Sequence, residues 1–306
     1  MMRAFFIALS ESRSLRHIAE RSRMGQRMSS RFVAGTTVEN ALSATRAVND
    51  AGMRVTLDNL GENTTNAEEA RQSAALYREL LDQIHTRNLD ANVSLKLTHM
   101  GLDIDPEIAR SITSGLVSHA ASIENFVRID MEGSEYTQRT LDLVHALHRT
   151  PGNGGAVGAV IQAYLHRSES DIDQLCSQGI RVRLCKGAYK EPPAIAFQEK
   201  SKVDANFVHL MKILLRSGIL HGIATHDEKM IDATIGFARS EGIAPDRFEF
   251  QMLYGIRRDL QEKLVRDGWG LRIYIPFGTE WYPYFMRRLA ERPANAFFIL
   301  KNLFRR

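Results

Sequence analysis

The sequence predicts an α/β fold of the (β/α)8 type, a TIM-like barrel with one or more extra helices at its N-terminus. Eight short segments rich in β-branched or apolar residues recur along the chain, and longer segments with apolar residues at helical spacing lie between them. Strands that alternate with helices form a parallel sheet. Eight such units within roughly 250 residues are typical of a closed barrel. An open doubly wound sheet is the alternative, and the absence of a G-x-G-x-x-G motif after the first strand speaks against it.

Local signals place the individual elements. A first helix is expected over residues 37–51, because Thr36 or Thr37 can cap its start and Gly52 lies just past its end. The expected strands are residues 54–58, 92–97, 126–130, 157–162, 180–184, 222–225, 247–251 and 271–275. The expected helices between them include residues 67–85, 172–176, 203–215, 230–238 and 260–265.

Composition and charge argue against several classes of protein. The chain has 306 residues, of which 44% are hydrophobic and 25% charged, as in a globular protein with a sizeable core. The net charge is +4, but no dense basic stripe with interleaved aromatics follows residue 35, so nucleic acid is not expected as a partner. Cys176 and Cys185 match no zinc spacing, and no H-x-H or H-E-x-x-H motif occurs, so no metal site is expected. No run of 18 apolar residues occurs, and this cysteine usage suits a reducing compartment, so a cytoplasmic location is expected.

The first 31 residues differ from the rest of the chain. They contain seven arginines against two glutamates. Three interpretations stay open: a transit peptide, a basic amphipathic helix that binds anionic lipid, and a solvated first helix that packs on the domain. We therefore expect two parts, a basic helical segment over residues 1–31 and the barrel over residues 32–306.

The expected strands end in polar residues. In a (β/α)8 barrel the active site lies at the C-terminal ends of the strands. These ends carry Asp58, Lys96, Asp130, Gln162, Arg183 with Lys186, Thr225 with His226, Gln251 and Tyr274. A polar residue at every strand end predicts a ligand site at this end of the barrel, where Asp130 could pair with either Lys96 or Arg183.

Cations are prominent in this set. Lys96, Arg183 and Lys186 are joined by Arg287 and Arg288, which lie on an amphipathic helix after the last strand. Two guanidiniums can clamp a small carboxylate through parallel hydrogen bonds, although a solvated helix face is the alternative. One carboxylate does not need five cations, which predicts a phosphorylated cofactor as well. The glycine after Lys186 lets backbone N–H groups approach a phosphate, although a plain turn would also explain it.

Short motifs follow one another at the tops of successive strands. They are LDNLGE at 57–62, SLKLT at 94–98, RIDME at 128–132, VIQAY at 160–164, RLCKGAY at 183–189, ATH at 224–226, FEFQMLYG at 248–255, and a Y-x-P-x-G, Y-P-Y and R-R-x-x-E-R-P-x-N run over 274–295. Each is weak alone, but all of them in this order are highly specific. From about residue 32 to residue 300 the chain resembles proline dehydrogenases of the short, monofunctional bacterial form.

The resemblance implies a distorted (β/α)8 barrel that binds FAD without a Rossmann domain. It implies oxidation of L-proline to Δ1-pyrroline-5-carboxylate by hydride transfer to flavin N5, with the electrons passed to a membrane quinone. Peripheral association with the inner face of the cytoplasmic membrane is consistent with that acceptor. Cys185 stands where the family more often has a β-branched residue, and we expect little effect from this difference.

The resemblance also implies roles for residues at matching motif positions. The expected grip on the substrate carboxylate is Lys96, Arg287 and Arg288, and the expected walls around the proline ring are Tyr189, Leu253, Tyr274 and Tyr284. The expected catalytic residues are Asp130 and Arg183. The expected flavin contacts are Met131, Gln162, Arg183, Lys186, Gly187, Ala188, Thr225 and His226. Glu62 matches a position that can pair with Arg183 as an ionic gate.

Two other hypotheses stay open. One is a different flavin barrel enzyme, such as a reductase resembling methylenetetrahydrofolate reductase, which would be reduced by a nicotinamide instead of proline. The other is a barrel without catalysis that serves as a binding or membrane scaffold through its basic N-terminus. Cations at the strand ends favour an enzyme over this second alternative.

Overall fold

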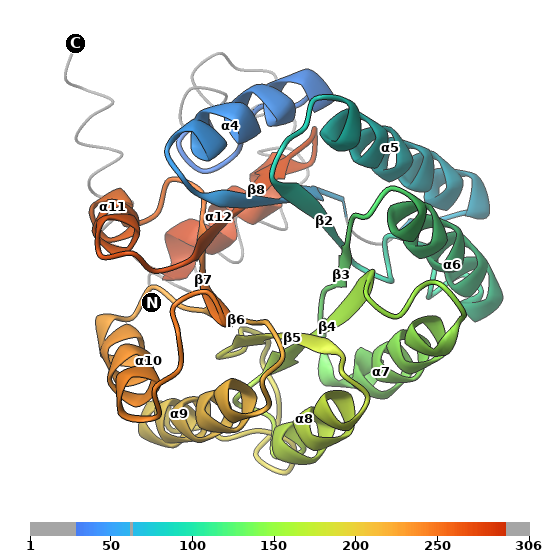
Figure 1. The fold of residues 1–306 in the computed structure, drawn as a ribbon. Helices are drawn as coiled ribbons and strands as arrows, with labels where there is room; N and C mark the ends of the chain where they lie inside the picture. Colours follow the sequence, from blue (N-terminus) through green and yellow to red (C-terminus); the bar gives the residue numbers. More distant parts are fainter. Residues whose placement is uncertain (1–28, 62–63, 292–306) are drawn as a thin grey trace.

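Eight parallel strands close into a barrel in the order β1 to β8, and helices surround it (Figure 1). The computed structural model describes residues 29–61 and 64–291, except for the side chains of residues 287–291. The strands are β1 Arg54–Asn59, β2 Ala91–Leu95, β3 Val127–Ile129, β4 Val157–Gln162, β5 Arg181–Cys185, β6 His221–Ala224, β7 Phe248–Leu253 and β8 Leu271–Phe277. The helices are α4 Val38–Asp50, α5 Ala67–Thr86, α6 Pro106–Ser122, α7 Ser134–Arg149, α8 Ser168–Ser177, α9 Lys200–Arg216, α10 Glu228–Ser240, α11 Arg258–Arg266 and α12 Trp281–Glu291.

The first and last of these helices are additions to the regular alternation of strands and helices. Helix α4 precedes β1, packs on β1 and β8, and occupies the outer ring between α11 and α5 (Figure 1). Helix α12 follows β8 and packs its aromatic side chains with Phe32, Leu60 and Ile256. Because Leu60 follows β1 and Ile256 follows β7, α12 lies over the C-terminal ends of strands. The expected distorted (β/α)8 barrel with an extra N-terminal helix is therefore confirmed.

Local capping agrees with the sequence signals. Thr37 caps α4 and accepts from the Asn40 backbone N–H at 3.2 Å, and Gly52 follows with a φ of +78°. Asn66 caps α5 by accepting from Glu69 N at 3.0 Å. All eight expected strands occur, with ends within two residues of the expected ones. No described helix is long and apolar enough to cross a membrane.

The inside of the barrel is unusually polar for this fold, whose interior is commonly filled by branched apolar side chains. Arg128 on β3 is buried, and its Nη1 donates to the carbonyl oxygens of Ala159 at 3.0 Å and Arg181 at 2.7 Å. Gly158 on the neighbouring strand leaves the space for it, because a Cβ there would lie 2.4 Å from the Arg181 carbonyl oxygen and 2.7 Å from Arg128 Nη1. Glycine in this strand is thus explained by the close approach of the Arg181 backbone and the Arg128 side chain.

His221, at the start of β6, is a buried histidine with a defined tautomer. The Val182 backbone N–H donates to its Nδ1 at 2.9 Å, so the proton of the neutral ring is on Nε2, which lies 2.9 Å from Ser217 Oγ. Burial, followed by the charge of Arg128, lowers the pKa of His221 to about 3. The ring therefore stays neutral in the folded protein at pH values where it is protonated in the unfolded chain.

This difference predicts a pH dependence of stability. At pH values between about 6.5, the ordinary pKa of histidine, and about 3, the His221 ring binds a proton in the unfolded chain but not in the folded protein. His221 therefore lowers the free energy of unfolding as the pH falls through this range. Relative to a His221→Asn variant, which keeps an acceptor for Val182 N–H, the native protein should lose about 2 kcal/mol of unfolding free energy between pH 7.5 and pH 5. Urea unfolding of both proteins at the two pH values measures this, and equal losses would contradict it.

Candidate active site

A buried ion pair links two strand ends at the mouth of the barrel. Arg183 Nη1 on β5 lies 2.8 Å from Oδ1 of Asp130, which follows β3, and the side chains are only 8% and 13% exposed. Ser94 on β2 donates its hydroxyl to the same Asp130 oxygen at 2.6 Å. The sequence left open whether Asp130 pairs with Lys96 or Arg183, and it pairs with Arg183.

A second ion pair lies across the mouth. Lys96 Nζ is 3.1 Å from Asp58 Oδ2, with side chains 14% and 2% exposed. In the sequence, Asp58 stands out only by its place at a strand end. Lys96 therefore lies beside a buried carboxylate and not only beside other cations.

The hydroxyl of Tyr274 on β8 joins the two pairs. It lies 2.6 Å from Asp58 Oδ2 and 2.9 Å from Asp130 Oδ2. Burial, with the charges of Asp130 and Asp58, raises the pKa of Tyr274 well above its ordinary value, so the phenol keeps its proton. A phenol has one proton and donates to one oxygen at a time. The second contact is a hydrogen bond only when one of the two carboxyls is protonated.

Asp58 is the carboxyl whose surroundings favour protonation. Burial raises its pKa, the nearby charge of Lys96 opposes this, and the charge of Asp130 raises it further. Tyr77 on α5, which the sequence analysis missed, also donates to Asp58 Oδ1 at 3.1 Å. Tyr77 carried no signal in the sequence beyond its place on the apolar face of a helix.

The expected flavin contacts lie on the arc of the barrel from β3 to β6. Gln162 at the end of β4 is buried and donates to the Glu132 carbonyl oxygen at 2.9 Å. His226 Nε2 accepts from the Leu253 backbone N–H at 2.9 Å, which orients the ring. Thr225 and Met131 are buried beside these strand ends.

Lys186 has two carboxylate partners in the structure. Its Nζ lies 2.5 Å from Asp204 Oδ1 and 2.8 Å from Asp227 Oδ2. The hydrogen bond from Lys186 is the main cause of the lowered pKa of Asp227. At Asp204, burial would raise the pKa, but the hydrogen bonds from Lys186 and Lys200 outweigh burial and lower it. The charge of Lys186 is therefore already balanced, which the sequence did not indicate.

Gly187 has a structural reason to be glycine. Its φ is +101°, and a Cβ there would lie 2.2 Å from the ring of Tyr164. Close packing on Tyr164 thus explains the glycine without a phosphate. Ala188 and Tyr189 follow on an exposed loop, with Tyr189 45% exposed.

The other expected walls of the pocket lie closer together. Leu253 and Tyr274 are direct neighbours in the register of β7 and β8. Tyr284 is buried in the cluster of α12 with Trp281 and Phe285. Glu62 and the side chains of Arg287 and Arg288 lie outside the described residues, so their predicted roles stay predictions.

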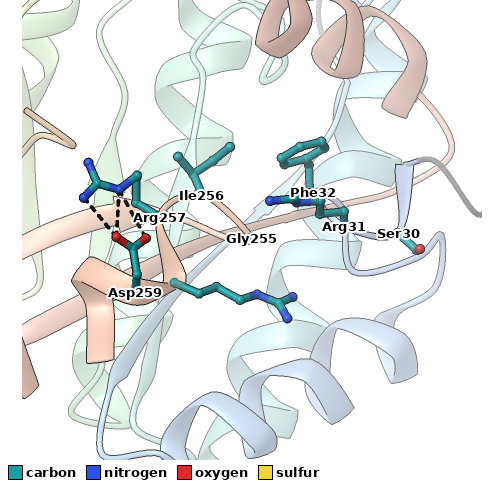
Figure 2. A pocket seen from close by; sticks show the side chains of 8 residues that line it. Ser30, Arg31, Phe32, Gly255, Ile256, Arg257 and Asp259 are labelled. Carbon is teal, nitrogen blue, oxygen red and sulfur yellow. Dashed lines mark hydrogen bonds and ion pairs between the residues drawn. The ribbon is translucent and has the colours of Figure 1, made fainter. Parts of the chain in front are cut away.

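A separate cavity of about 620 Å³ lies between residues 30–32 and residues 255–259 (Figure 2). Arg257 is on its wall and its guanidinium is paired with Asp259 and with Glu228. None of the strand-end residues described above lines this cavity.

Within the described residues, no group of three or more His, Cys, Asp or Glu could hold a metal ion.

Comparison with known proteins assigns the chain to a family. The proline dehydrogenase family model matches residues 41–301. Proline dehydrogenase 2 of Bacillus subtilis is 41% identical over 302 residues, 98% of each chain, and proline dehydrogenase of Deinococcus radiodurans is 37% identical over 281 residues, 90% of each. A crystal structure of proline utilization A from Bdellovibrio bacteriovorus, inactivated by N-propargylglycine, matches with a TM-score of 0.82 and 26% identity, over 89% of this chain and 33% of the other. The chain belongs to the proline dehydrogenase family of enzymes.

Proposed function

We propose that this enzyme oxidises L-proline to Δ1-pyrroline-5-carboxylate with FAD as its cofactor and passes the electrons to a quinone. Proline is the substrate of proline dehydrogenases, so the proposal concerns how this chain performs the reaction. The observation that carries it is the pair of buried ion pairs at the barrel mouth, Asp58–Lys96 and Asp130–Arg183, joined through Tyr274. Charged groups concentrated in this way at strand ends suit a small charged substrate.

Substrate binding would begin with the carboxylate. Lys96 is the described cation best placed for it, because its side chain is 14% exposed and Asp58 orients the ammonium. Arg287 and Arg288 of α12 would complete the grip through bidentate hydrogen bonds. Tyr274 and Leu253, with Tyr284 and Tyr189 from α12 and the loop after β5, would enclose the ring. Apolar and aromatic walls of this kind exclude water and favour the neutral amine that oxidation requires.

The residues on the β4 to β6 side fit a flavin by their chemistry. Arg183, Gln162 and Lys186 offer a guanidinium, an amide and an ammonium, and Thr225 and His226 add a hydroxyl and an imidazole. Such donors suit the polar edge of a flavin and a pyrophosphate. Met131, Gly187 and Ala188 would add apolar and backbone contacts. When bound, FAD would accept a hydride at N5 from the carbon next to the nitrogen of proline.

The chain's own contribution is to position and to polarise. Lys96 would fix the carboxylate, which places the reacting carbon and lowers the entropic barrier. Asp130 would hold the Arg183 guanidinium in its orientation through the 2.8 Å contact. Tyr274 Oη keeps a proton between two carboxyls and so couples their ionisation.

Two parts of the proposal concern access and location. Glu62 would pair with Arg183 as a gate over the site. The basic segment over residues 1–31 would bring the enzyme to the inner face of the cytoplasmic membrane, where anionic lipid and quinone meet.

The function has a direct test. The purified protein should be yellow, and L-proline added without oxygen should bleach its flavin absorbance. A reduced nicotinamide should not bleach it, which separates the proposal from a reductase of the same fold. Colourless protein that takes up no FAD would overturn the cofactor assignment, and yellow protein unaffected by proline would overturn the reaction.

Two matched lysine substitutions test the division of the cations. Lys96→Met should raise the KM for proline roughly ten- to hundredfold, because a hydrogen bond to a charged group is lost, and should leave the flavin content near normal. Lys186→Met should lower the flavin content of the purified protein and leave the KM of the flavin-loaded fraction near normal. Steady-state kinetics and the flavin-to-protein absorbance ratio measure both effects. The opposite pattern, or the same effect from both changes, would contradict the division.

The shared hydroxyl of Tyr274 predicts a pH effect. The hydrogen bond from Tyr274 lowers the pKa of Asp58, against the raising effect of burial. Tyr274→Phe removes this bond, so the pKa of Asp58 rises and the ionised form that holds Lys96 is lost at higher pH. The acid limb of kcat/KM should therefore move to higher pH. Tyr136→Phe, which removes an exposed hydroxyl bonded to Asp103, is the control. An unmoved limb in Tyr274→Phe, or an equal shift in the control, would refute the coupling.

A further inference from the structure

A chain of hydrogen bonds runs from the barrel mouth into the barrel. Arg183 Nε donates to Gln251 Oε1 at 2.5 Å, and Gln251 Nε2 donates to Glu249 Oε1 at 2.7 Å. The residues are 5–6% exposed. Glu249 and Gln251 are two apart on β7, so their side chains lie on the same, inward face of the strand. Glu249 lies toward the N-terminal end of the barrel, away from the strand ends.

The chemistry of the three groups fixes the orientation of the central amide. A guanidinium has only donors, and an ionised carboxylate has only acceptors. The Gln251 amide can satisfy both neighbours in only one of its two orientations, with its oxygen toward Arg183. If Glu249 offered no acceptor, the NH2 side of the amide would lose the bond that anchors it, and the position of the amide oxygen beside Arg183 would no longer be fixed.

Glu249 is itself firmly held as an anion. Arg272 Nε lies 2.6 Å from Glu249 Oε1, and Arg54 Nη1 lies 3.4 Å from Oε2. Arg272 is in turn fixed by its Nη1, which donates to the Val55 carbonyl oxygen at 2.6 Å. Burial alone would raise the pKa of Glu249, but the charge and hydrogen bond of Arg272 outweigh it, and the pKa lies below its ordinary value.

The neighbouring strand leaves space for this arrangement. Gly222 on β6 pairs with Glu249 in the register of the two strands. A Cβ at Gly222 would lie 2.4 Å from Gln251 Nε2. Any larger residue at this position would push the amide out of line with Arg183.

We propose that Glu249 is a positioning residue for Arg183, acting through the side-chain amide of Gln251. It touches neither substrate nor cofactor and sets the direction in which the guanidinium faces the mouth. The consequence for the reaction rests on the proposed role of Arg183 beside the flavin. The orientation of Arg183 itself does not depend on that proposed role.

One test removes the acceptor and then restores it. In the double variant Glu249→Met with Arg272→Met, both buried charges are lost together, which avoids an unpaired arginine. Its rate of anaerobic flavin reduction by saturating proline should fall roughly ten- to hundredfold while the KM changes little, because a misplaced group slows chemistry without touching the carboxylate grip. The separate variant Glu249→Gln keeps an acceptor oxygen for the Gln251 amide and should retain most of the native rate. A normal rate in the double variant would overturn the relay, as would a loss in Glu249→Gln equal to that in the double variant.

A second test needs no activity and does not rely on the stability of that double variant. Gly222→Ala should displace the amide, and Gly236→Ala on α10, where a Cβ meets nothing within 4 Å, is the matched control. In ¹⁵N-labelled protein as purified, the Nε–H of Arg183, identified by its loss in Arg183→Lys, should exchange slowly with solvent in the native protein and in Gly236→Ala. In Gly222→Ala, the chemical shift of the Arg183 Nε–H should change and its exchange with solvent should be faster. An unchanged signal would overturn the relay, whereas protein that proline does not reduce would overturn only the proposed function.

Discussion

The guanidinium of Arg183 is a charge buried inside the barrel, and the arrangement of the surrounding strands follows from the need to pair it. A charge removed from water is tolerated only when it is paired and hydrogen-bonded. Ser94 on β2, Asp130 after β3 and Gln251 on β7 supply those bonds, and the Tyr274 ring on β8 packs 5.2 Å from the guanidinium carbon. Partners from four other strands can meet one arginine only if the sheet closes, so barrel closure and the site depend on each other.

Two regions of the barrel mouth can be distinguished in this network, and Tyr274 links them. Lys96 and Asp58 lie on the side proposed for the substrate, and Arg183 and Asp130 on the side proposed for the flavin. The Tyr274 hydroxyl lies within hydrogen-bond distance of a carboxyl on each side and donates to one of them at a time, so a change in the ionisation of one carboxyl alters the hydrogen bonding of the other. Binding a carboxylate beside Lys96 would change the field at Asp58 and, through the phenol, at Asp130. The geometry thus provides a physical route from the proposed substrate side of the mouth to the side proposed for the flavin.

Sequence reasoning predicted the parts that depend on local periodicity and strand ends. The eight strands, the cap at Thr37 and the polar ends at Asp130 and Arg183 follow from such signals. Which charges pair could not be read from the sequence, because pairing depends on the register and curvature of the closed sheet. The neighbouring glycine of Lys186 gives no sign of its two carboxylate partners, which come from α9 and the start of α10. Glu249 does not follow from the strand-end pattern because it lies deeper in the barrel, although polar residues at alternate positions of β7 do indicate a polar inward face.

The central claim is that the mouth of the barrel holds the substrate carboxylate at Lys96 while Arg183 stays bound to Asp130 and Gln251. The most direct measurement is a crystal structure of the oxidised, flavin-loaded enzyme with a cyclic carboxylate inhibitor that resembles proline. The account predicts the inhibitor carboxylate within hydrogen-bond distance of Lys96 Nζ, with both bonds of Arg183 retained. An inhibitor bound away from Lys96, or an Arg183 side chain turned away from Asp130 and Gln251, would contradict it.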